Sequence, residues 1–278
     1  PLQIQISPDY AADQTLFVAG NFNLYRSVNG GASFALQRYW TVGMVGMAMG
    51  KRPAQTPLLY YLTYDGPAYM IFLSDDYAST SVPVYGDCVR LPAWGLAVSP
   101  LLAGGLPDLY AHGSLGVDLS PDGGFSFSPR DSGLNAFVFN GLSGSGATVV
   151  AGGENGWFKS SNTGNGWVRR SFPFATDTFA LYPMISPNYA ADSTIFMTNT
   201  QEVYRSTDGG ASFSRVLQLP PQAFSFPGFS VEPDFTPLTG VVFPGAAACR
   251  LWRSLDGARH YALVPDGVLF SPLGIAHI

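Results

Sequence analysis

The stretch Arg26-Ser27-Val28-Asn29-Gly30-Gly31-Ala32-Ser33-Phe34 decides the fold, because versions of it return five more times along the chain. An Asn or Asp two residues after a Ser can accept hydrogen bonds from the backbone N–H groups of a tight turn. The glycine that follows supplies a positive φ without steric cost. The stretch therefore predicts a hairpin turn, with Phe34 as an apolar plug at the start of the next strand.

The six copies follow one another at a regular spacing. Their first serines are 47, 46, 40, 46 and 48 residues apart, a period that is typical of four-stranded blades and not of helical repeats. The copy at Ser74 is the weakest, because it contains no glycine. The defining residues are Ser27, Asn29, Gly31 and Phe34; Ser74 and Asp76; Ser120, Asp122, Gly124 and Phe127; Ser160, Asn162, Gly164 and Trp167; Ser206, Asp208, Gly210 and Phe213; and Ser254, Asp256 and Tyr261.

This pattern resembles the Asp-box, or BNR, repeat SxDxGxTW. That repeat is found in sialidase-like, sortilin-like and xyloglucanase-like β-propellers and in the propeller that assists photosystem II assembly. The resemblance covers essentially the whole chain and implies an all-β propeller of four-stranded antiparallel blades. It does not imply one function, since the same repeat serves hydrolases, receptors and assembly factors.

A second internal match describes one whole blade. Residues 6–34 align with residues 185–213 without a gap, and 17 of the 29 positions are identical. The shared text reads as strand, loop, strand, strand, turn and strand. With this blade as a ruler, the predicted strands are 2–6, 15–19, 24–27 and 33–37; 42–49, 58–63, 68–73 and 82–85; 95–98, 108–112, 116–119 and 125–128; 136–139, 148–151, 157–160 and 167–170; 181–185, 194–198, 202–206 and 213–217; and 229–231, 240–243, 251–254 and 261–264.

The number of blades follows from the spacing. The residues before the first copy and after the last one together make about one period, so six blades use the 278 residues once, as one domain over 1–278. Stacking the blades in a ring buries the apolar faces that a lone sheet would expose. One segment fits less well, because residues 272–278 resemble an innermost strand. That tail is either a strand that closes the ring or the start of a seventh blade in an incomplete chain.

The composition excludes some classes of function. The chain is 46% hydrophobic and only 12% charged, so its surface is unusually poor in charge and suits coverage by a partner. A net charge of -5 lacks the basic footprint of a nucleic-acid binder, and we predict no nucleic-acid partner. No apolar run reaches the about 18 to 20 residues that span a bilayer, so we predict no transmembrane segment.

The first residue is Pro1 rather than Met, which a cleaved signal peptide or trimming of a longer polypeptide would explain. We favour export and expect a secreted, extracellular or cell-surface protein, with the periplasm as another compartment. The two cysteines, Cys88 and Cys249, fall in different predicted blades. Unbridged thiols are favoured over a disulfide between them.

The repeats themselves are expected to be structural. Arg26, Arg205 and Arg253 precede three copies, but equivalent positions in different blades indicate a blade feature and not the arginine triad of sialidases. The Arg-Ile-Pro element of sialidases is missing, and the sequence identifies no Tyr–Glu pair of the kind that those enzymes use as a nucleophile. Sialidase activity is therefore disfavoured.

Metal and cofactor sites are not predicted either. Asp13 and Asp192 occupy matched loops, where a carboxylate would cap the turn or contribute to a calcium site; capping is favoured, because neither loop holds a dense cluster of further carboxylates. His112, His260 and His277 lack metal-ligand spacing, and no phosphate-binding, dinucleotide-binding or GxSxG motif is present. We predict no metal, no cofactor and no catalytic residue.

Function is expected on the face opposite the turns, formed by connections between second and third strands and between blades. The candidate binding residues there are Tyr39, Trp40, Asp65, Asp87, Trp94, Glu154 and Asp177, with Tyr64, Asp131, Phe174 and Glu202 as further aromatic or acidic residues. We predict a non-catalytic module that binds protein or serves as a scaffold, as a subunit of a larger assembly. The alternative is a carbohydrate-active propeller, a glycoside hydrolase or lectin, with a sugar groove on that face.

Overall fold

The structure is a computed structural model. It describes residues 3–52, 55–65, 68–85, 93–99, 106–135, 138–153, 156–174, 181–199, 202–218, 230–231, 242–243, 246–247, 250–256, 260, 262–263, 268–271 and 274–277. The chain packs as two compact units, residues 1–44 with 186–278 and residues 45–185. The single domain over 1–278 stays a prediction.

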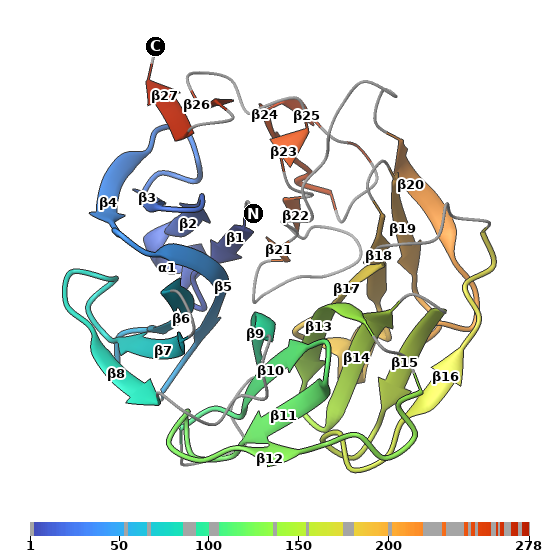
Figure 1. Ribbon diagram of the computed structural model, residues 1–278. Helices are drawn as coiled ribbons and strands as arrows, with labels where there is room; N and C mark the ends of the chain where they lie inside the picture. Colours follow the sequence, from blue (N-terminus) through green and yellow to red (C-terminus); the bar gives the residue numbers. More distant parts are fainter. Residues whose placement is uncertain are drawn as a thin grey trace. The chain divides into compact units, whose positions relative to one another are not determined.

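Five antiparallel sheets of four strands make up most of the described chain, each with its strands in sequence order (Figure 1). The first sheet contains β1 (Gln3–Ile6), β2 (Leu16–Ala19), β3 (Asn23–Ser27) and β4 (Ala35–Tyr39), and the second contains β5 (Gly43–Gly50), β6 (Leu58–Asp65), β7 (Ala68–Ser74) and β8 (Val82–Tyr85). The third contains β9 (Ala93–Val98), β10 (Leu109–Gly113), β11 (Gly116–Ser120) and β12 (Ser128–Pro129). The fourth contains β13 (Phe139–Ser145), β14 (Thr148–Gly153), β15 (Gly156–Ser160) and β16 (Val168–Arg170), and the fifth contains β17 (Tyr182–Ile185), β18 (Ile195–Thr198), β19 (Glu202–Ser206) and β20 (Ser214–Gln218).

The predicted counts of six or seven blades are wrong, because only five sheets in the described chain have four strands. Near the predicted sixth blade, β21 (Ser230–Val231) pairs only with β22 (Val242–Phe243), while β24 (Arg250–Arg253) lies between β23 (Ala246–Ala247) and β25 (Ala262–Leu263). The unpredicted strand β23 occupies the edge of β24 that β22 would need. The sequence between β21 and β23 also contains three prolines, which cannot donate to a strand ladder.

The tail does not start a further four-stranded sheet. Its strand β27 (Gly274–His277) pairs with β26 (Val268–Ser271) in a two-stranded sheet of its own. A strand was expected at this place, but as an innermost strand that closes the first sheet or begins a seventh. The pairing with β26 is a local hairpin, which costs less loop-closure entropy than a return to a strand at the start of the chain.

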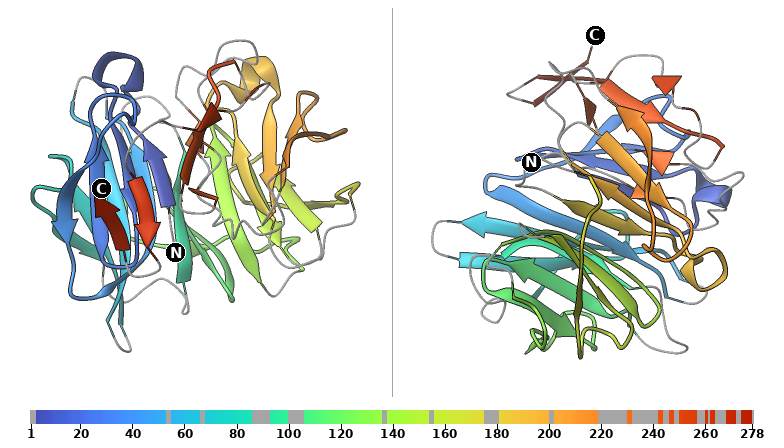
Figure 2. Two further views of the ribbon diagram at one scale, coloured as in Figure 1. Left: turned by 90° about the horizontal axis from the view of Figure 1, so that it is seen from above. Right: turned by 90° about the vertical axis from the view of Figure 1, so that its right-hand side faces the viewer.

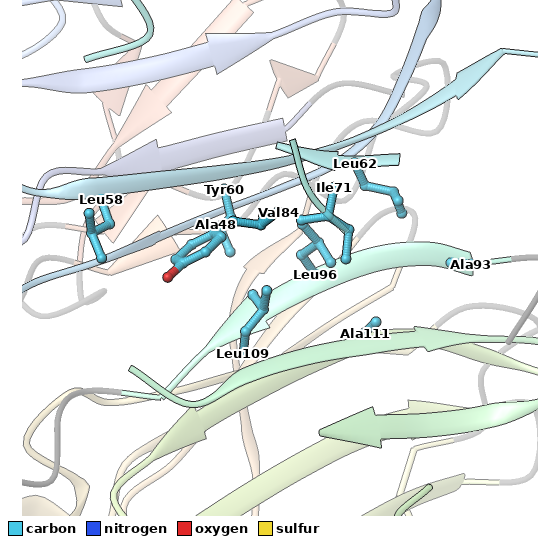
Figure 3. Close-up of a cluster of buried hydrophobic side chains, with 10 residues drawn as sticks. All are labelled: Ala48, Leu58, Tyr60, Leu62, Ile71, Val84, Ala93, Leu96, Leu109 and Ala111. Atoms are coloured by element: carbon cyan, nitrogen blue, oxygen red, sulfur yellow. The ribbon is translucent and has the colours of Figure 1, made fainter. Parts of the chain in front are cut away.

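A fully buried aliphatic residue lies across the ladder from the serine that begins each repeat. Its members in the five sheets are Leu16, Leu59, Leu109, Val149 and Ile195. Leu109 and neighbours from β9 and β10 pack against Leu58, Tyr60 and Leu62 of β6 in one apolar cluster (Figure 3). Burying such a side chain contributes roughly 1.5 to 3 kcal/mol. Within residues 45–185, the core thus lies between neighbouring sheets.

The first strand of the fourth sheet was mispredicted. The apolar residues 136–139 were expected to form it, but β13 covers Phe139–Ser145, a run rich in glycine and serine that reads as a loop. Glycine suits this strand because β13 passes close to β17. A Cβ on Gly141 would lie 3.1 Å from Cδ of Pro183 and 3.3 Å from Cα of Tyr182. Phe139 and Leu142 of β13 are buried in the core, and Gly141 between them allows the close approach of the two backbones.

The outer strand of each sheet carries arginine or proline. These residues are Arg38 in β4, Pro83 in β8, Pro129 in β12, Arg169 in β16 and Arg215 in β20. An edge strand presents unpaired backbone groups that can join another chain, and charge or proline prevents that pairing. Several of the few charged residues are thus used to keep sheet edges apart.

Two one-turn helices, α1 (Tyr10–Asp13) and α2 (Tyr189–Asp192), connect the first and second strands of their sheets. Both have the sequence YAAD and end at a residue with left-handed backbone, Gln14 (φ 47°) and Ser193 (φ 51°). Figure 2 shows α1 standing at one end of the first sheet. In the part of the chain that the structure describes, no helix has the length and apolar character needed to cross a membrane.

Candidate binding face

The turn between the third and fourth strands is held by its own side chains in every repeat. In the fifth sheet, Ser206 Oγ donates to Asp208 Oδ1 (2.7 Å), and the N–H of Gly210 donates to Ser206 Oγ (2.8 Å). The N–H of Ser212 then donates to Asp208 Oδ1 (2.9 Å). The same Ser-to-Asx hydrogen bond, at 2.7 to 2.9 Å, is found at Ser27–Asn29, Ser74–Asp76, Ser120–Asp122, Ser160–Asn162 and Ser254–Asp256. We call these six turns the corners.

The corners need two successive residues with left-handed backbone. In the fifth sheet these are Gly209 (φ 71°) and Gly210 (φ 90°). The glycine-free copy adopts the same shape with Tyr77 (φ 59°) and Ala78 (φ 69°), so side-chain hydrogen bonds outweigh the strain there. The aromatic plugs Phe34 and Trp167 are buried, Phe127 packs against the core, Phe213 is half-buried, and Tyr261 lies outside the described residues.

Replacing Asp122 by alanine is expected to destabilise the protein by about 1 to 2 kcal/mol, because Ser126 and Ser120 lose their acceptor. Asp122→Asn is the matched control and should cost less than half as much, since Asn162 accepts the equivalent N–H of Gly166 at 2.9 Å. Urea unfolding at pH 7 measures both variants. Equal losses in the two would show that the corner hydrogen bonds are not the cause.

Acid provides a second test of the same residue. Burial raises the pKa of Asp122, but hydrogen bonds from Ser126 and Ser120 outweigh it and hold the pKa below the usual 3.8. The stabilisation by the charged carboxylate is therefore complete above pH 3.8 and is lost as the pH falls through the lowered pKa. The stability difference between wild type and Asp122→Asn should shrink in that range.

The remaining polar groups at the corner end also serve the backbone. Asp13 accepts hydrogen bonds from the Ser7 hydroxyl (2.7 Å) and the Thr15 N–H (2.8 Å), and Asp192 does the same for Ser186 and Thr194. This geometry is that of a turn cap. In the described part of the chain, no group of three His, Cys, Asp or Glu residues could hold a metal ion.

Two of the three arginines before the corners, Arg26 and Arg205, each lie opposite a phenylalanine of their own sheet. The guanidinium of Arg26 lies 6.0 Å from the ring centroid of Phe17, its cross-strand partner. Phe196 and Arg205 are partners in the same register of the fifth sheet. The side chain of Arg253 lies outside the described residues. Arg26 thus packs within its own sheet, as a repeated blade feature would.

Opposite the corners, the predicted binding residues differ in how far their side chains are exposed to solvent. Tyr39 is 64% exposed, whereas Trp40 is only 8% exposed and lies beneath the guanidinium of Arg38, 5.9 Å from its ring centroid. Trp94 in β9 is half-buried. Asp87, Glu154 and Asp177 lie outside the described residues, as do Cys88, Cys249 and the side chains of Asp65 and His277.

Phe22 is an exposed aromatic residue that the sequence analysis missed. It is 45% exposed in the turn between β2 and β3, and its carbonyl accepts a hydrogen bond from the N–H of Trp40 (2.8 Å). Asn23, the next residue, lies across the ladder from Tyr39. Phe22 and Tyr39 therefore lie on neighbouring segments of the first sheet, and we call these two exposed residues the Phe22–Tyr39 patch.

The second and third sheets expose apolar residues at their equivalent turns. Tyr64 is exposed at the end of β6, and its ring centroid lies 4.8 Å from that of Tyr69 in β7. Leu115 is exposed in the turn between β10 and β11. Asp131, a candidate acid, instead accepts the N–H of Val117 (3.1 Å) and so closes a strand end.

The structure reveals a Tyr–Glu pair that sequence reasoning did not identify. The hydroxyl of Tyr204 donates to Glu202 Oε2 (2.5 Å), and Arg215 Nη1 donates to Glu202 Oε1 (2.8 Å). Tyr204 is 3% exposed, and burial together with the Glu202 hydrogen bond raises its pKa. An activated nucleophile needs the opposite, a lowered pKa and access to substrate. The pair therefore braces β19 against β20.

The surroundings of His112 and His260 also limit the chemistry that these two side chains can perform. His112 is buried, its Nδ1–H donates to the carbonyl of Phe139 (3.1 Å), and burial lowers its pKa to about 4. His260 is exposed and contacts Asp256 of its own corner (2.5 Å). Neither ring is presented to a substrate together with a second catalytic group. The arrangement offers surfaces for binding more readily than reactive groups.

Comparisons with known proteins support this fold. A GH74 enzyme from Niastella koreensis superimposes with a TM-score of 0.62 at 14% identity over 94% of this chain and 44% of its own. A structure of YCF48 bound to D1 peptide gives 0.54 at 14% identity over 94% and 81%, and a nidogen–laminin complex gives 0.65 at 9% identity over 89% and 91%. The chain is a β-propeller. Each four-stranded sheet is one blade, and five are present in the described residues.

Other comparisons place limits on what this likeness means. The propeller spans less than half the length of the GH74 enzymes that it matches. Neither the protein-family models nor the curated proteins contain a match to the sequence. At identities this low, structural similarity establishes the fold of this chain and not its activity.

Proposed function

We propose that this propeller is a non-catalytic protein-binding module of the Asp-box type that acts outside the cytoplasm. Its partner contacts the blade ends opposite the corners. The observation that carries the proposal is the Phe22–Tyr39 patch, two exposed aromatic side chains on segments that a backbone hydrogen bond between Trp40 and Phe22 holds together. Exposed aromatic residues on a rigid backing are typical of the energetic centres of protein interfaces.

The internal duplication supports this choice of face. Blades one and five are 17/29 identical over residues 6–34 and 185–213, but residues 18–24 differ from 197–203 at seven successive positions. These positions form the turn between second and third strands, opposite the corners. Phe22 and Tyr39 correspond to Gln201 and Gln218 in the fifth blade. The two blades thus have nearly the same sequence at their corner ends. At the opposite ends they carry different side chains, aromatic in the first blade and polar in the fifth.

Two of the similar structures favour protein as the ligand. YCF48 is named as bound to D1 peptide, and another similar structure is that of a nidogen/laminin complex. The alternative, a carbohydrate-active propeller, draws on the GH74 enzymes. Such an enzyme needs two carboxylates about 5 to 9.5 Å apart. Among the described residues, Glu202 is the acid near this face with a buried network, and its partners are Tyr204, Arg215 and Asn199 rather than a second acid.

Selection of a displayed random-peptide library on the immobilised whole chain tests the proposal. We expect enriched peptides whose affinity falls about tenfold or more in the double variant Phe22→Ala/Tyr39→Ala, because removing interface aromatics costs more than 1 kcal/mol each. The matched control is Val28→Ala/Phe125→Ala, which removes two apolar residues equally exposed at the corners. That control should bind as wild type does.

A parallel titration with xyloglucan oligosaccharides separates the two functions. No peptide enrichment, combined with oligosaccharide binding that the Phe22→Ala/Tyr39→Ala variant loses, would contradict a protein-binding role. It would favour the carbohydrate-active alternative. Peptide binding lost equally in the corner control would place the surface elsewhere on the chain.

A further inference from the structure

Two tyrosines at equivalent positions in neighbouring blades have hydroxyl groups that the described protein does not satisfy. Tyr60 in β6 and Tyr110 in β10 each follow the aliphatic residue that lies opposite the corner serine. Both side chains are 0% exposed, and both hydroxyl oxygens are buried without a hydrogen-bond partner among the described residues. A buried hydroxyl left unpaired costs about 1 to 3 kcal/mol, so this arrangement needs an explanation.

Two arginines have the same deficit as the tyrosines. The charge of Arg52 acts on Tyr60 and that of Arg130 acts on Tyr110, and the Nε–H of both arginines is buried with no acceptor among the described residues. Other atoms fix their positions: Arg52 Nη2 donates to Asp75 (3.2 Å), and Arg130 Nη1 donates to the carbonyl of Pro129 (3.0 Å). Burial raises the pKa of Tyr60 to about 12, and the charge of Arg52 acts against that rise.

The site around Tyr110 also contains an acceptor. Asp108, two residues earlier, is half-buried, and burial raises the pKa of its carboxyl while the Arg130 charge lowers it. The charges of Asp108 and Arg130 both act on the Tyr110 hydroxyl. Two buried donors, the Tyr110 hydroxyl and the Arg130 Nε–H, thus share the electrostatic influence of one carboxylate without a hydrogen bond to it.

We propose that each Tyr–Arg pair, Tyr60 with Arg52 and Tyr110 with Arg130, binds one buried water molecule. Water accepts two hydrogen bonds, here from the tyrosine O–H and the arginine Nε–H, and donates two. Beside Tyr110 it donates one of these to Asp108. Three bonds to otherwise unsatisfied groups are the usual complement of a buried water. The site is neutral overall, with one positive and one negative side chain at Tyr110, which favours water over an ion.

The other blades provide a natural reference. At the position equivalent to Tyr60 and Tyr110, the first and fifth blades have Phe17 and Phe196. There the cross-strand partner is an arginine, Arg26 or Arg205, and the guanidinium of Arg26 stacks on the Phe17 ring. The fold therefore accepts phenylalanine at this place, and a Tyr→Phe change tests only the hydroxyl.

The experiment is urea unfolding of the whole chain carrying Tyr110→Phe or Tyr60→Phe. If water completes the network, each variant loses about five- to tenfold in its folding equilibrium constant, because one hydrogen bond to each water is removed. An unpaired hydroxyl predicts the reverse, equal or greater stability, and that result would overturn the proposal. Tyr39→Phe is the control, since its exposed hydroxyl remains in solvent in both states and its removal should change nothing.

A crystal structure provides the direct readout. Wild type should show one ordered water within 2.7 to 3.2 Å of the tyrosine oxygen and of the arginine Nε, and each Phe variant should lack it. If both sites lacked the water, or showed a direct hydrogen bond between tyrosine and arginine, the proposal would be wrong even if the variants were destabilised. The double variant Tyr110→Phe/Arg130→Lys adds a third test, because a shared water makes the two losses non-additive.

Discussion

Gly152→Ala is expected to destabilise this propeller by about 3 kcal/mol or more, the largest effect of any substitution considered. A Cβ on Gly152 in β14 would lie 1.9 Å from the carbonyl oxygen and 2.7 Å from the carbonyl carbon of Leu181. Both atoms are backbone at the entrance to β17, so relief requires moving a strand and not a rotamer. Overpacking costs typically 1 to 3 kcal/mol and more where backbone must move.

An opposing effect exists but is smaller. Gly→Ala reduces the entropy of the unfolded chain and stabilises by about 0.4 to 1 kcal/mol where the alanine fits. The matched control is Gly144→Ala in the adjacent strand β13, where the added Cβ meets Ser99 Cβ at 3.4 Å, an ordinary contact. Urea unfolding should show Gly144→Ala within about 1 kcal/mol of wild type. If Gly152→Ala were as stable as wild type, the carbonyl group of Leu181 could not lie this close to Gly152.

The second large effect is a loss of stability in mild acid caused by His112. Burial lowers its pKa from 6.5 to about 4, so the folded state favours the neutral ring. Between these values the unfolded chain binds the additional proton, and stability must fall as the pH falls. The shift corresponds to about 3 kcal/mol, complete above pH 6.5 and lost progressively down to about pH 4.

Unfolding free energies at intervals from pH 7.5 to pH 4 measure this slope. The variant His112→Gln keeps a side-chain N–H for the Phe139 carbonyl and has no proton to gain, so its curve should be flatter over the whole range. The comparison uses the slope of the unfolding free energy against pH and not the absolute stability of His112→Gln. The corner carboxylates of Asp76, Asp122 and Asp208 do not interfere, because their lowered pKa values place their titration below this window. Parallel curves for the two proteins would contradict the role of His112.

The candidate site was only partly accessible from sequence. Tyr39 and Trp40 were both predicted as binding residues, yet the first is exposed and the second is buried under Arg38. Phe22 was missed, although it lies in the longest run of differences between the duplicated blades. Exposure depends on which side chain a neighbouring turn covers. That information is absent from a pattern of residue types along one strand.

The Glu202–Tyr204–Arg215 network shows the same limit. Glu202 and Tyr204 are two residues apart on one strand, and such spacing alone marks side chains on the same face of a strand. Only the pairing of β19 with β20, which includes a register shift between Val203 and Tyr204, brings Arg215 to them. The corresponding residues of the first blade are Asn23, Tyr25 and Leu36. The first blade therefore lacks the acid and the arginine of this network.

The sequence by itself determined the corners, because their hydrogen bonds join residues two to four positions apart, and with the corners it determined the repeat period. It also determined the strands of blades one and five, because the two segments repeat the same pattern. Tertiary structure alone decided the number of four-stranded blades, since β23 takes the edge of β24 that the pattern assigned to β22. It also decided the glycine-rich strand β13, whose existence depends on a close approach to β17 from residues some 40 positions away. Interactions between distant segments leave no periodic trace in the chain, whereas local turn chemistry repeats each time the turn is formed.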